Sequence, residues 1–372
     1  MEGVSFPYRA DLGSKLLSAI AGERIIALYF IGSTLTSTIP GISIAGATPE
    51  LTLYTPACDV EYLVLGRPAS LDVVPVTPEG IPTPALITRA ALRAADIPCL
   101  VVDCGSYVEP AVPHVALPSK RVGGRIDSGS ALPYDTAAKL MSESELLARC
   151  LCSRGCTVVL GESIPGGTTT ALGILAALGY EAWGKVSSAG PENPHRLKEA
   201  VVKEGLAKSG LASKGETDDP VEAVSAVGDP VHISLAGFLI GALSKGSHVI
   251  LAGGTQMAAV LAIAKRAGAA LEGRVAVATT RWVVEDLSSD IVGLIKEVAP
   301  EVPIVAAALN FSNSPFKGLK YYEEGYVKEG VGAGGTVAAA LASGRASLPD
   351  IYKAIFSEYA RLLELGALKQ QI

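Results

Sequence analysis

The chain has 372 residues and a formal net charge of −6, with 49% hydrophobic and 18% charged residues. A weakly acidic chain lacks the basic surface that holds nucleic acid nonspecifically, so we expect no nucleic-acid partner. The 40 glycines and 23 prolines in an otherwise apolar chain are typical of an α/β enzyme rather than of a disordered or fibrous protein. The longest apolar stretches, 231–243 and 249–264, are short or interrupted by glycine and Gln256, so we expect no membrane partner either.

Residues 1–22 mix charged with apolar side chains and do not resemble a signal peptide, which predicts a cytoplasmic protein. Six cysteines are too few for a disulfide scaffold in a chain of this size. Cys150, Cys152 and Cys156 lie close together, but no histidine or second cysteine pair completes a zinc-binding spacing. We therefore expect the cysteines to be small buried side chains, and we expect no metal and no cofactor.

The N-terminal part of the chain predicts few regular elements between long loops. Its expected elements are a helix over 8–22, strands over 24–31, 61–65 and 99–103, a helix over 89–95 and a helix over 135–154. Residues 32–38 form a hydroxyl-rich loop, and residues 40–56 form a loop dense in glycine, proline and threonine. Such a long loop in a compact domain is often functional.

From residue 157 onward, strands alternate with helices. The expected strands cover 157–160, 181–186, 248–251, 274–279 and 304–309, and the expected helices cover 171–178, 194–208, 221–227, 231–243, 257–267, 289–298, 336–342 and 349–365. This alternation predicts an α/β fold with a mostly parallel, Rossmann-like sheet and helices on both faces. We expect a large nucleotide-binding catalytic domain over 23–343 and a small helical subdomain from 1–22 and 344–372.

The stretch GESIPGGTTT at 161–170 lies between a buried strand and a helix. A strand, a glycine-rich turn and a helix start together make an anion cradle, because free N–H groups and the helix dipole point at the same place. No Lys-Ser/Thr pair follows the glycines, so this is not a Walker A loop. The alternative is an ordinary strand-to-helix turn capped by threonine.

Glycine, hydroxyl and amide groups recur where the other predicted strands end. Ligands of open parallel sheets bind outside the carboxyl ends of the strands, so these groups predict a site for a polar small molecule. The candidate residues at these ends are Lys185, Ser187, Ser188, Gly253, Gly254, Thr255, Gln256 and Asn310.

The loop KEGVGAGGT at 328–336 places Glu329 at the start of a predicted helix. A carboxylate in a partly apolar pocket can act as a general base near neutral pH. It can equally cap the helix dipole from solvent, and the residues alone do not decide between the two.

Three of these motifs, GESIPGGTTT at 161–170, GGTQMAA at 253–259 and KEGVGAGG at 328–335, resemble those of the nicotinate-nucleotide:dimethylbenzimidazole phosphoribosyltransferases of cobamide (cobalamin) biosynthesis. The resemblance to the archaeal branch covers nearly the whole chain, including PGIS at 40–43 and TPALITR at 83–89. The resemblance to the bacterial enzymes covers only about 158–336.

The resemblance implies a homodimer that transfers phosphoribose from nicotinate mononucleotide to a benzimidazole-type aromatic nitrogenous base. It implies that Glu329 removes the proton of the base, that Lys198 holds the phosphate with Lys185 as second choice, and that the glycine-rich loops bind substrate. The loop residues implied are Glu162, Gly166, Gly167, Thr168, Thr169, Gly330 and Gly332. The Pro-Gly-Ser-Leu-Gly-type motif of the bacterial enzymes is missing, and the 40–56 loop is expected to form part of the base pocket, so the accepted base need not be dimethylbenzimidazole.

Two other functions use the same phosphate cradle. One is another ribosyl transfer or hydrolysis on a nucleotide, which the missing bacterial motif leaves open. The other is a nucleotide-binding regulatory protein without catalysis, which Glu329 disfavours because a pure binder needs no buried base.

Overall fold

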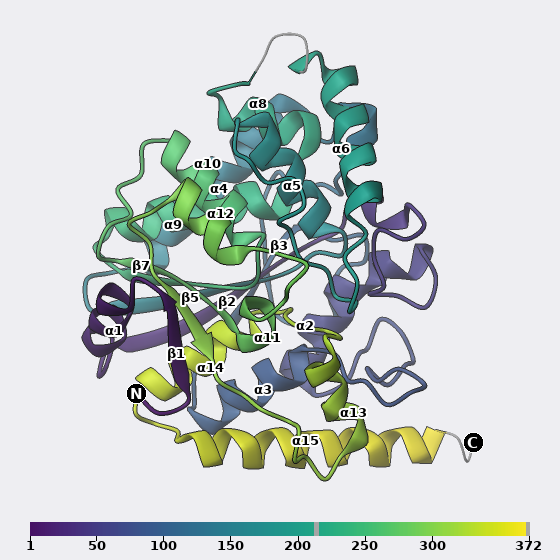
Figure 1. Ribbon diagram of the computed structural model, residues 1–372, viewed down its shortest axis with the longest axis vertical. Coiled ribbons are helices and arrows are strands. Elements are labelled where there is room, and N and C mark those ends of the chain that lie inside the picture. The colour runs from purple at the N-terminus through teal and green to yellow at the C-terminus, as the bar shows by residue number, and fades with distance from the viewer. Residues whose placement is uncertain (212–215, 370–372) are drawn as a thin grey trace.

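A computed structural model describes residues 1–211 and 216–369, and an eight-stranded sheet runs through this part of the chain (Figure 1). The strands lie in the order β1-β8-β7-β6-β5-β2-β3-β4, and every neighbouring pair is parallel except β1 and β8. Their bounds are β1 Val4–Tyr8, β2 Arg24–Gly32, β3 Cys99–Gly105, β4 Val115–Ala116, β5 Cys156–Ser163, β6 His248–Ala252, β7 Val275–Thr280 and β8 Ile304–Ala307.

The central strand β5 is buried along its whole length. Its Leu160 pairs with Leu28 of β2 on one side and Leu251 of β6 on the other. Burial on both faces explains why its central residues, Val158–Leu160, form a continuous apolar run rather than an alternating pattern. From β2 the chain builds the sheet toward β4, and from β5 it builds toward β8. The strand order therefore reverses between β2 and β5, the kind of point where open α/β sheets bind ligands.

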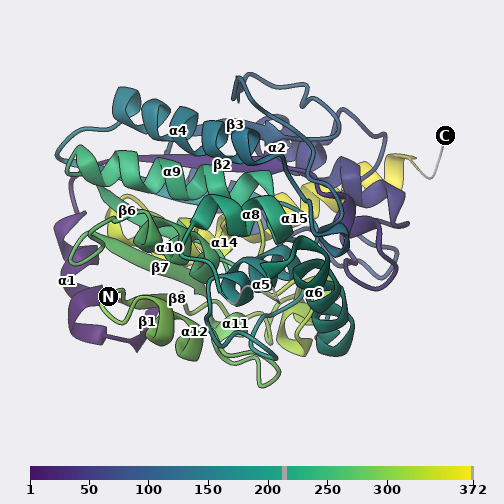
Figure 2. The same ribbon diagram turned by 90° about the horizontal axis from the view of Figure 1, so that it is seen from above.

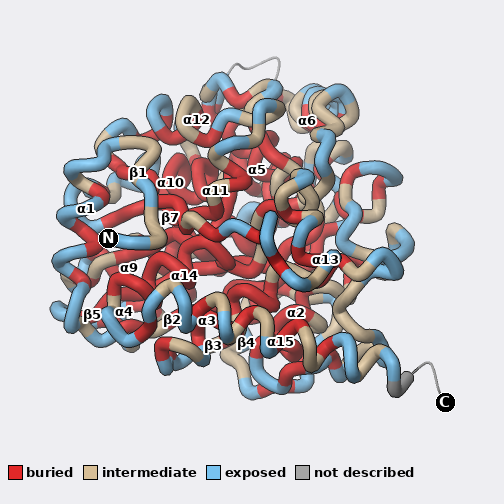
Figure 3. Tube along the Cα trace, turned by 60° about the horizontal axis from the view of Figure 1, so that its bottom comes forward, coloured by how far each residue is buried: buried red, intermediate tan, exposed pale blue. Residues whose placement is uncertain are grey.

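Helices cover both faces of the sheet, each over its own hydrophobic core (Figure 1). One face carries α4 Tyr134–Leu151, α5 Gly167–Ala177, α6 His195–Ser209, α8 Pro220–Val227, α9 Pro230–Ser244, α10 Met257–Arg266 and α12 Ile291–Val298. The other carries α1 Ala10–Ala19, α2 Thr55–Leu65, α3 Ala85–Ala94, α14 Ala333–Ala342 and α15 Leu348–Lys369. Short turns of helix connect them: η1 Leu35–Thr38, η2 Glu50–Tyr54, η3 Ile126–Ser128, α11 Arg281–Val284, α13 Lys317–Lys320 and η4 Tyr321–Glu324. Figure 3 shows the sheet and the helices next to it as the most buried parts.

The expected mostly parallel sheet with helices on both faces is confirmed, but two local predictions are wrong and the edge strand β1 was missed. Residues 181–186 form a turn, closed by the bond from the Lys185 N–H to the Ala182 carbonyl, instead of a strand. Residues 61–65 end the helix α2, since a five-residue apolar run fits a buried helix as well as a strand. The edge strand β1 was not predicted because it is short and contains Pro7.

The two chain ends that were expected to form a small helical subdomain pack against different elements. The helix α1 packs near β1 and β8, while α15 lies against α3. The grouping of 1–22 with 344–372 stays a prediction, and residues 370–372 lie outside the described part. In that described part, no helix is both long enough and apolar enough to cross a membrane.

The helices α4 and α9 run side by side in close contact (Figure 2). Gly237 and Gly241 of α9 face the backbone of α4. A Cβ atom at Gly237 would lie 2.1 Å from the Met141 carbonyl oxygen, and one at Gly241 would lie 2.4 Å from that of Glu145. The close approach of these helices therefore requires glycine at both positions.

We predict that Gly237→Ala lowers the free energy of unfolding by about 1–3 kcal/mol, because the added methyl group pushes α9 away from α4. The matched control is Gly366→Ala in α15, where nothing lies within 4 Å of the added Cβ atom. The free energy of unfolding of that control should rise by about 0.5–1 kcal/mol, because alanine has a higher helix propensity than glycine. Denaturant unfolding measures both, and a change of the same sign in the two variants would contradict the packing argument.

Candidate active site

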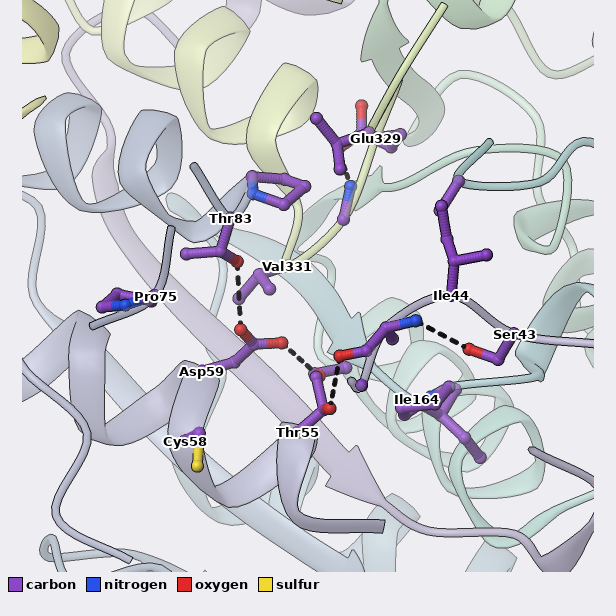
Figure 4. A pocket seen from close by; sticks show the side chains of 18 of the residues that line it. Ser43, Ile44, Thr55, Cys58, Asp59, Pro75, Thr83, Ile164, Glu329 and Val331 are labelled. Carbon is purple, nitrogen blue, oxygen red and sulfur yellow. Dashed lines mark hydrogen bonds between the residues drawn. The ribbon is translucent and has the colours of Figure 1, made fainter. Parts of the chain in front are cut away.

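A cavity of about 540 Å³ opens at the carboxyl ends of the central strands, where the strand order reverses. We call it the strand-end cavity (Figure 4). From the second part of the chain it is lined by residues 162–168, 187–189, 254–256, Val283 and 327–331. From the first part of the chain it is lined by residues 42–47, Leu51, Thr55, Cys58, Asp59, Pro68, Leu71, 73–78 and 81–84. Segments far apart in the sequence thus meet in one space.

The loop after β5 brings its glycines close to neighbouring segments. Gly166 has φ +79° and precedes α5, and a Cβ atom there would lie 3.2 Å from the Ser37 Cα atom. Of the three threonines that follow, Thr168 lines the cavity. Thr170 is buried and donates to Asp229, and the buried Thr169 hydroxyl has no hydrogen-bond partner. The loop therefore presents backbone and one hydroxyl group, rather than three, to the cavity.

Lys198 of α6 stands directly behind this loop and is fully buried. Its Nζ donates to the Ser187 carbonyl at 2.6 Å, the Ser188 Oγ at 2.6 Å and the Thr168 Oγ1 at 2.9 Å. Among the described residues no carboxylate lies within ion-pair distance of it. Burial, helped by the nearby positive charge of Lys328, lowers the pKa of Lys198 to about 7. A cation held by neutral oxygens only is well placed to receive an anion.

A second buried lysine, Lys328, lies near Lys198. Its Nζ is 2.8 Å from the Asp286 Oδ2 and donates to the Gly190 carbonyl at 3.0 Å. Burial opposes ionisation of Asp286, but hydrogen bonds from Lys328 and Ser288 prevail and hold the pKa of that carboxyl well below its usual range. This corner of the cavity therefore carries two ammonium groups against one carboxylate.

Glu329 follows directly and is half-buried at the start of α14. Its carboxylate accepts from the N–H groups of Thr280 at 2.9 Å, Gly330 at 3.1 Å and Gly334 at 3.2 Å. Burial raises the pKa of Glu329 to about 7 although these donors favour the anion. The carboxylate thus caps the helix and also lines the cavity, so the two interpretations of the sequence are compatible.

The backbone that holds Glu329 is strained. Val327 and Val331 have φ of +45° and +51°, a region that β-branched residues rarely adopt. The Val327 N–H donates to the Ala189 carbonyl at 2.7 Å, and the Val331 N–H donates to the Glu162 carbonyl at 3.1 Å. These bonds tie the Glu329 loop to two other lining segments, 187–189 and 162–168.

Glu162 is the second carboxylate of the cavity and is 3% exposed. It accepts from the Gln256 side chain and from the Ile164 N–H. Burial raises its pKa to about 7; the His232 charge opposes the shift and the Glu329 charge adds to it. Two neighbouring carboxylates with raised pKa values are typical of sites that transfer protons or stabilise positive charge.

The structure brings most of the predicted residues together. Glu162, Gly166, Gly167, Thr168, Ser187, Ser188, Gly254, Thr255, Gln256, Glu329 and Gly330 line the strand-end cavity. Lys198 lies directly behind it, as described above, while the buried Thr169 and Gly253 do not line it. Gly332 also lies off the lining, where it packs near Gly161 and Tyr29.

Two predicted residues lie elsewhere. Lys185 is 3.3 Å from the Glu297 carboxylate and does not line the cavity, because residues 181–186 form a turn instead of a strand that ends at the site. Asn310 follows β8, which is separated from β5 by β7 and β6, and its N–H donates to the Tyr352 hydroxyl at 2.7 Å.

Sequence reasoning missed Cys58, Asp59, Asp286 and a site role for Lys328. Predicting 61–65 as a strand hid the helix α2, which carries Cys58 and Asp59 into the cavity. The prolines between residues 75 and 84 were a signal, since such a stiff extended segment forms part of the wall. In the described residues, no group of three or more His, Cys, Asp and Glu side chains is placed to hold a metal ion.

Comparisons with known proteins show which proteins this chain resembles. A family model described as Phosphoribosyltransferase matches residues 86–279. A UPF0284 protein of Aeropyrum pernix is 51% identical over 348 residues, which is 94% of this chain and 95% of that protein. A UPF0284 protein of Pyrococcus furiosus is 48% identical over 341 residues, with 91% and 99% coverage.

Solved structures show the same fold at low sequence identity. The crystal structure of CobT from Thermus thermophilus matches with a TM-score of 0.63 and 16% identity, over 92% of this chain and 89% of that one. A nicotinate-nucleotide-dimethylbenzimidazole phosphoribosyltransferase structure from the same organism matches with a TM-score of 0.61 and 18% identity, with the same coverage.

We predict that Glu162→Gln stabilises the protein at alkaline pH. Because the folded state raises the pKa of Glu162 to about 7, the folded protein holds this proton more tightly than the unfolded chain does. The wild type therefore loses stability as the pH rises from the range of a free glutamate toward about 7, and a glutamine escapes this loss. The variant should be about 1–3 kcal/mol more stable near pH ~8, with a smaller gain near pH ~5.

Denaturant unfolding at both pH values measures this difference. The exposed Glu272→Gln is the control and should change stability little at either pH. A gain for Glu162→Gln that does not grow with pH would contradict the assignment of a raised pKa to this carboxyl group.

Proposed function

This chain belongs to the phosphoribosyltransferase family, together with archaeal UPF0284 proteins, and on this premise we propose that it transfers phosphoribose from nicotinate mononucleotide to an aromatic nitrogenous base. The products would be nicotinate and an α-riboside phosphate, the activated lower ligand of a cobamide. The observation that carries the proposal is that one cavity is lined by the buried Lys328 and by two carboxylates with raised pKa values, with the buried Lys198 directly behind its wall.

The lysine corner suits the phosphate of the mononucleotide. Lys198 offers an ammonium group held by Thr168 and Ser188, whose hydroxyls can turn to donate to phosphate oxygens. The start of α5 adds backbone N–H groups and the positive end of its dipole. A bound dianion would favour the charged form of Lys198, so its lowered pKa would rise on binding.

The carboxylates suit the ribose and the incoming base. The nicotinate ring of the mononucleotide is a pyridinium, so when its bond to C1′ breaks, the bonding electrons neutralise the ring nitrogen and no proton is needed. The lone-pair nitrogen of the base forms the new bond to C1′, and the base must lose the proton of its other ring nitrogen, which Glu329 would accept. The negative charge of Glu162 would stabilise the positive charge that develops on the ribose. Binding both reactants in line supplies much of the remaining acceleration.

The homodimer that the resemblance implies and the cytoplasmic location expected from residues 1–22 remain part of this proposal. In another ribosyl transfer, or in hydrolysis, the lysine corner would bind the nucleotide phosphate in the same way, and a different molecule would accept the ribosyl group. Nicotinate release that does not depend on an added base would favour one of these reactions.

We predict that Glu329→Gln lowers kcat for base-dependent nicotinate release by about 10²–10⁴-fold, the usual contribution of one general base. In the wild type the rate should rise with pH through about 7, because Glu329 accepts a proton only when it is ionised. Chromatography of released nicotinate measures both. The exposed Glu324→Gln should retain activity, and a Glu329→Gln enzyme with an unchanged rate would exclude Glu329 as the base.

We predict that Lys198→Met raises KM for nicotinate mononucleotide by about 10–100-fold, since a charge-assisted hydrogen bond to phosphate is lost. Lys185→Met is the matched control, because Lys185 pairs with Glu297 outside the cavity. Steady-state kinetics with varied mononucleotide separates the two. Equal effects of the two substitutions would contradict the placement of the phosphate beside Lys198.

A further inference from the structure

The carboxylate of Asp59 lies in the cavity wall and has no role in the transfer described above. Asp59 belongs to α2 and is 9% exposed. Its Oδ1 accepts from the Thr83 hydroxyl at 3.1 Å and its Oδ2 accepts from the Ser163 hydroxyl at 2.7 Å (Figure 4). Among the described residues, no lysine, arginine or histidine lies within ion-pair distance of it.

Asp59 therefore has unused acceptor capacity. An ionised carboxylate can accept about four hydrogen bonds, and two hydroxyl groups supply only two. Burial raises its pKa to about 6, so the group is mostly an anion at neutral pH. A buried anion with only neutral partners gains from any ligand that brings further donors.

The cavity wall near Asp59 is otherwise mainly apolar. Pro75, Val76, Ile81 and Pro82 line the same cavity from the segment that includes Thr83. Such a wall accommodates a flat aromatic ring. A ring with only methyl substituents would remove water from Asp59 and return no hydrogen bond, which weakens binding. A ring with an N–H or O–H substituent would return that bond.

Of the two rings in the reaction, the accepting base suits Asp59 better. Nicotinate carries a carboxylate, which the negative charge of Asp59 would repel, and no positive side chain pairs with Asp59 to offset this repulsion. The accepting base is neutral. Figure 4 shows Asp59 and Glu329 reaching the cavity from different elements, α2 and the loop before α14, so one ring could meet both groups at different edges.

We propose that Asp59 selects the accepting base and favours aromatic nitrogen bases with an amino or hydroxyl substituent over their methyl-substituted counterparts. The inference rests on the proposed function and specifies its substrate class. Asp59 acts by accepting a hydrogen bond from that substituent, while the ring N–H faces Glu329 and the bond to C1′ forms at the other ring nitrogen, which carries the free lone pair.

A purely structural role for Asp59 predicts something different. Through Ser163 and Thr83 this residue links α2 to the end of β5 and to the segment before α3. If that were its only role, substitution would lower stability and slow the reaction equally with every base. The ratio of rates between matched bases separates the two roles, because a general loss cancels in the ratio.

The test compares 5-amino-, 5-hydroxy- and 5-methylbenzimidazole, which differ by one substituent of similar size. With the wild type, kcat/KM should be about tenfold or more higher for the amino and hydroxy bases than for the methyl base. Asp59→Asn should reduce this preference, and Asp59→Leu should reverse it. Asp135→Asn changes an exposed aspartate outside the cavity; it is the control and should leave the ratio unchanged.

Several results would overturn the inference. They are a wild type without preference, an equal loss of rate with all three bases in both Asp59 variants, or a changed KM for nicotinate mononucleotide at an unchanged base ratio. If no base supports nicotinate release, the proposed function itself fails. Calorimetric binding of the three bases to the wild type then decides the role of Asp59: tighter binding of the amino and hydroxy bases supports it, and equal binding excludes it.

Discussion

The start of α14 packs directly on the ends of the central strands, and the position of Glu329 depends on this contact. A Cβ atom at Gly334 would lie 2.0 Å from the Thr279 carbonyl carbon, and one at Gly335 would lie 2.3 Å from the Ala252 Cβ atom. Only glycine permits such an approach. The strained backbone at Val331 follows from the same geometry and is held by its bond to the Glu162 carbonyl. Helix, carboxylate and anion loop are thus positioned by one packing arrangement.

The electrostatics of the strand-end cavity follow from burial. Burial raises the pKa values of Glu162, Glu329 and Asp59 and lowers that of Lys198, so burial disfavours the charged form of each group. Nicotinate mononucleotide, the proposed donor, carries an anionic phosphate and a cationic ring, which would complement the lysine corner and the carboxylates respectively. The free energy of binding can therefore offset the cost of holding these groups away from water.

The sequence predicted the parts of the site that depend on local patterns. Strands, glycine-rich loops and the placement of Glu329 and Lys198 follow from periodicity, turn chemistry and the family motifs, and the structure brings these loops together. Asp59 and Asp286 were missed because their contacts depend on chain segments far away in the sequence, such as the bond between Asp59 and Ser163. Lys185 was expected in the site because residues 181–186 resemble a strand, and only the tertiary structure shows the turn there.

The central claim is that the base attacks C1′ from the side opposite to departing nicotinate, within this one cavity. The most direct test is the configuration of the product, determined by nuclear magnetic resonance of the riboside phosphate formed from β-configured nicotinate mononucleotide and a benzimidazole base. In-line displacement inverts the anomeric carbon, so the account predicts the α-riboside as the only product. A β-riboside, or a mixture of both anomers, would contradict it.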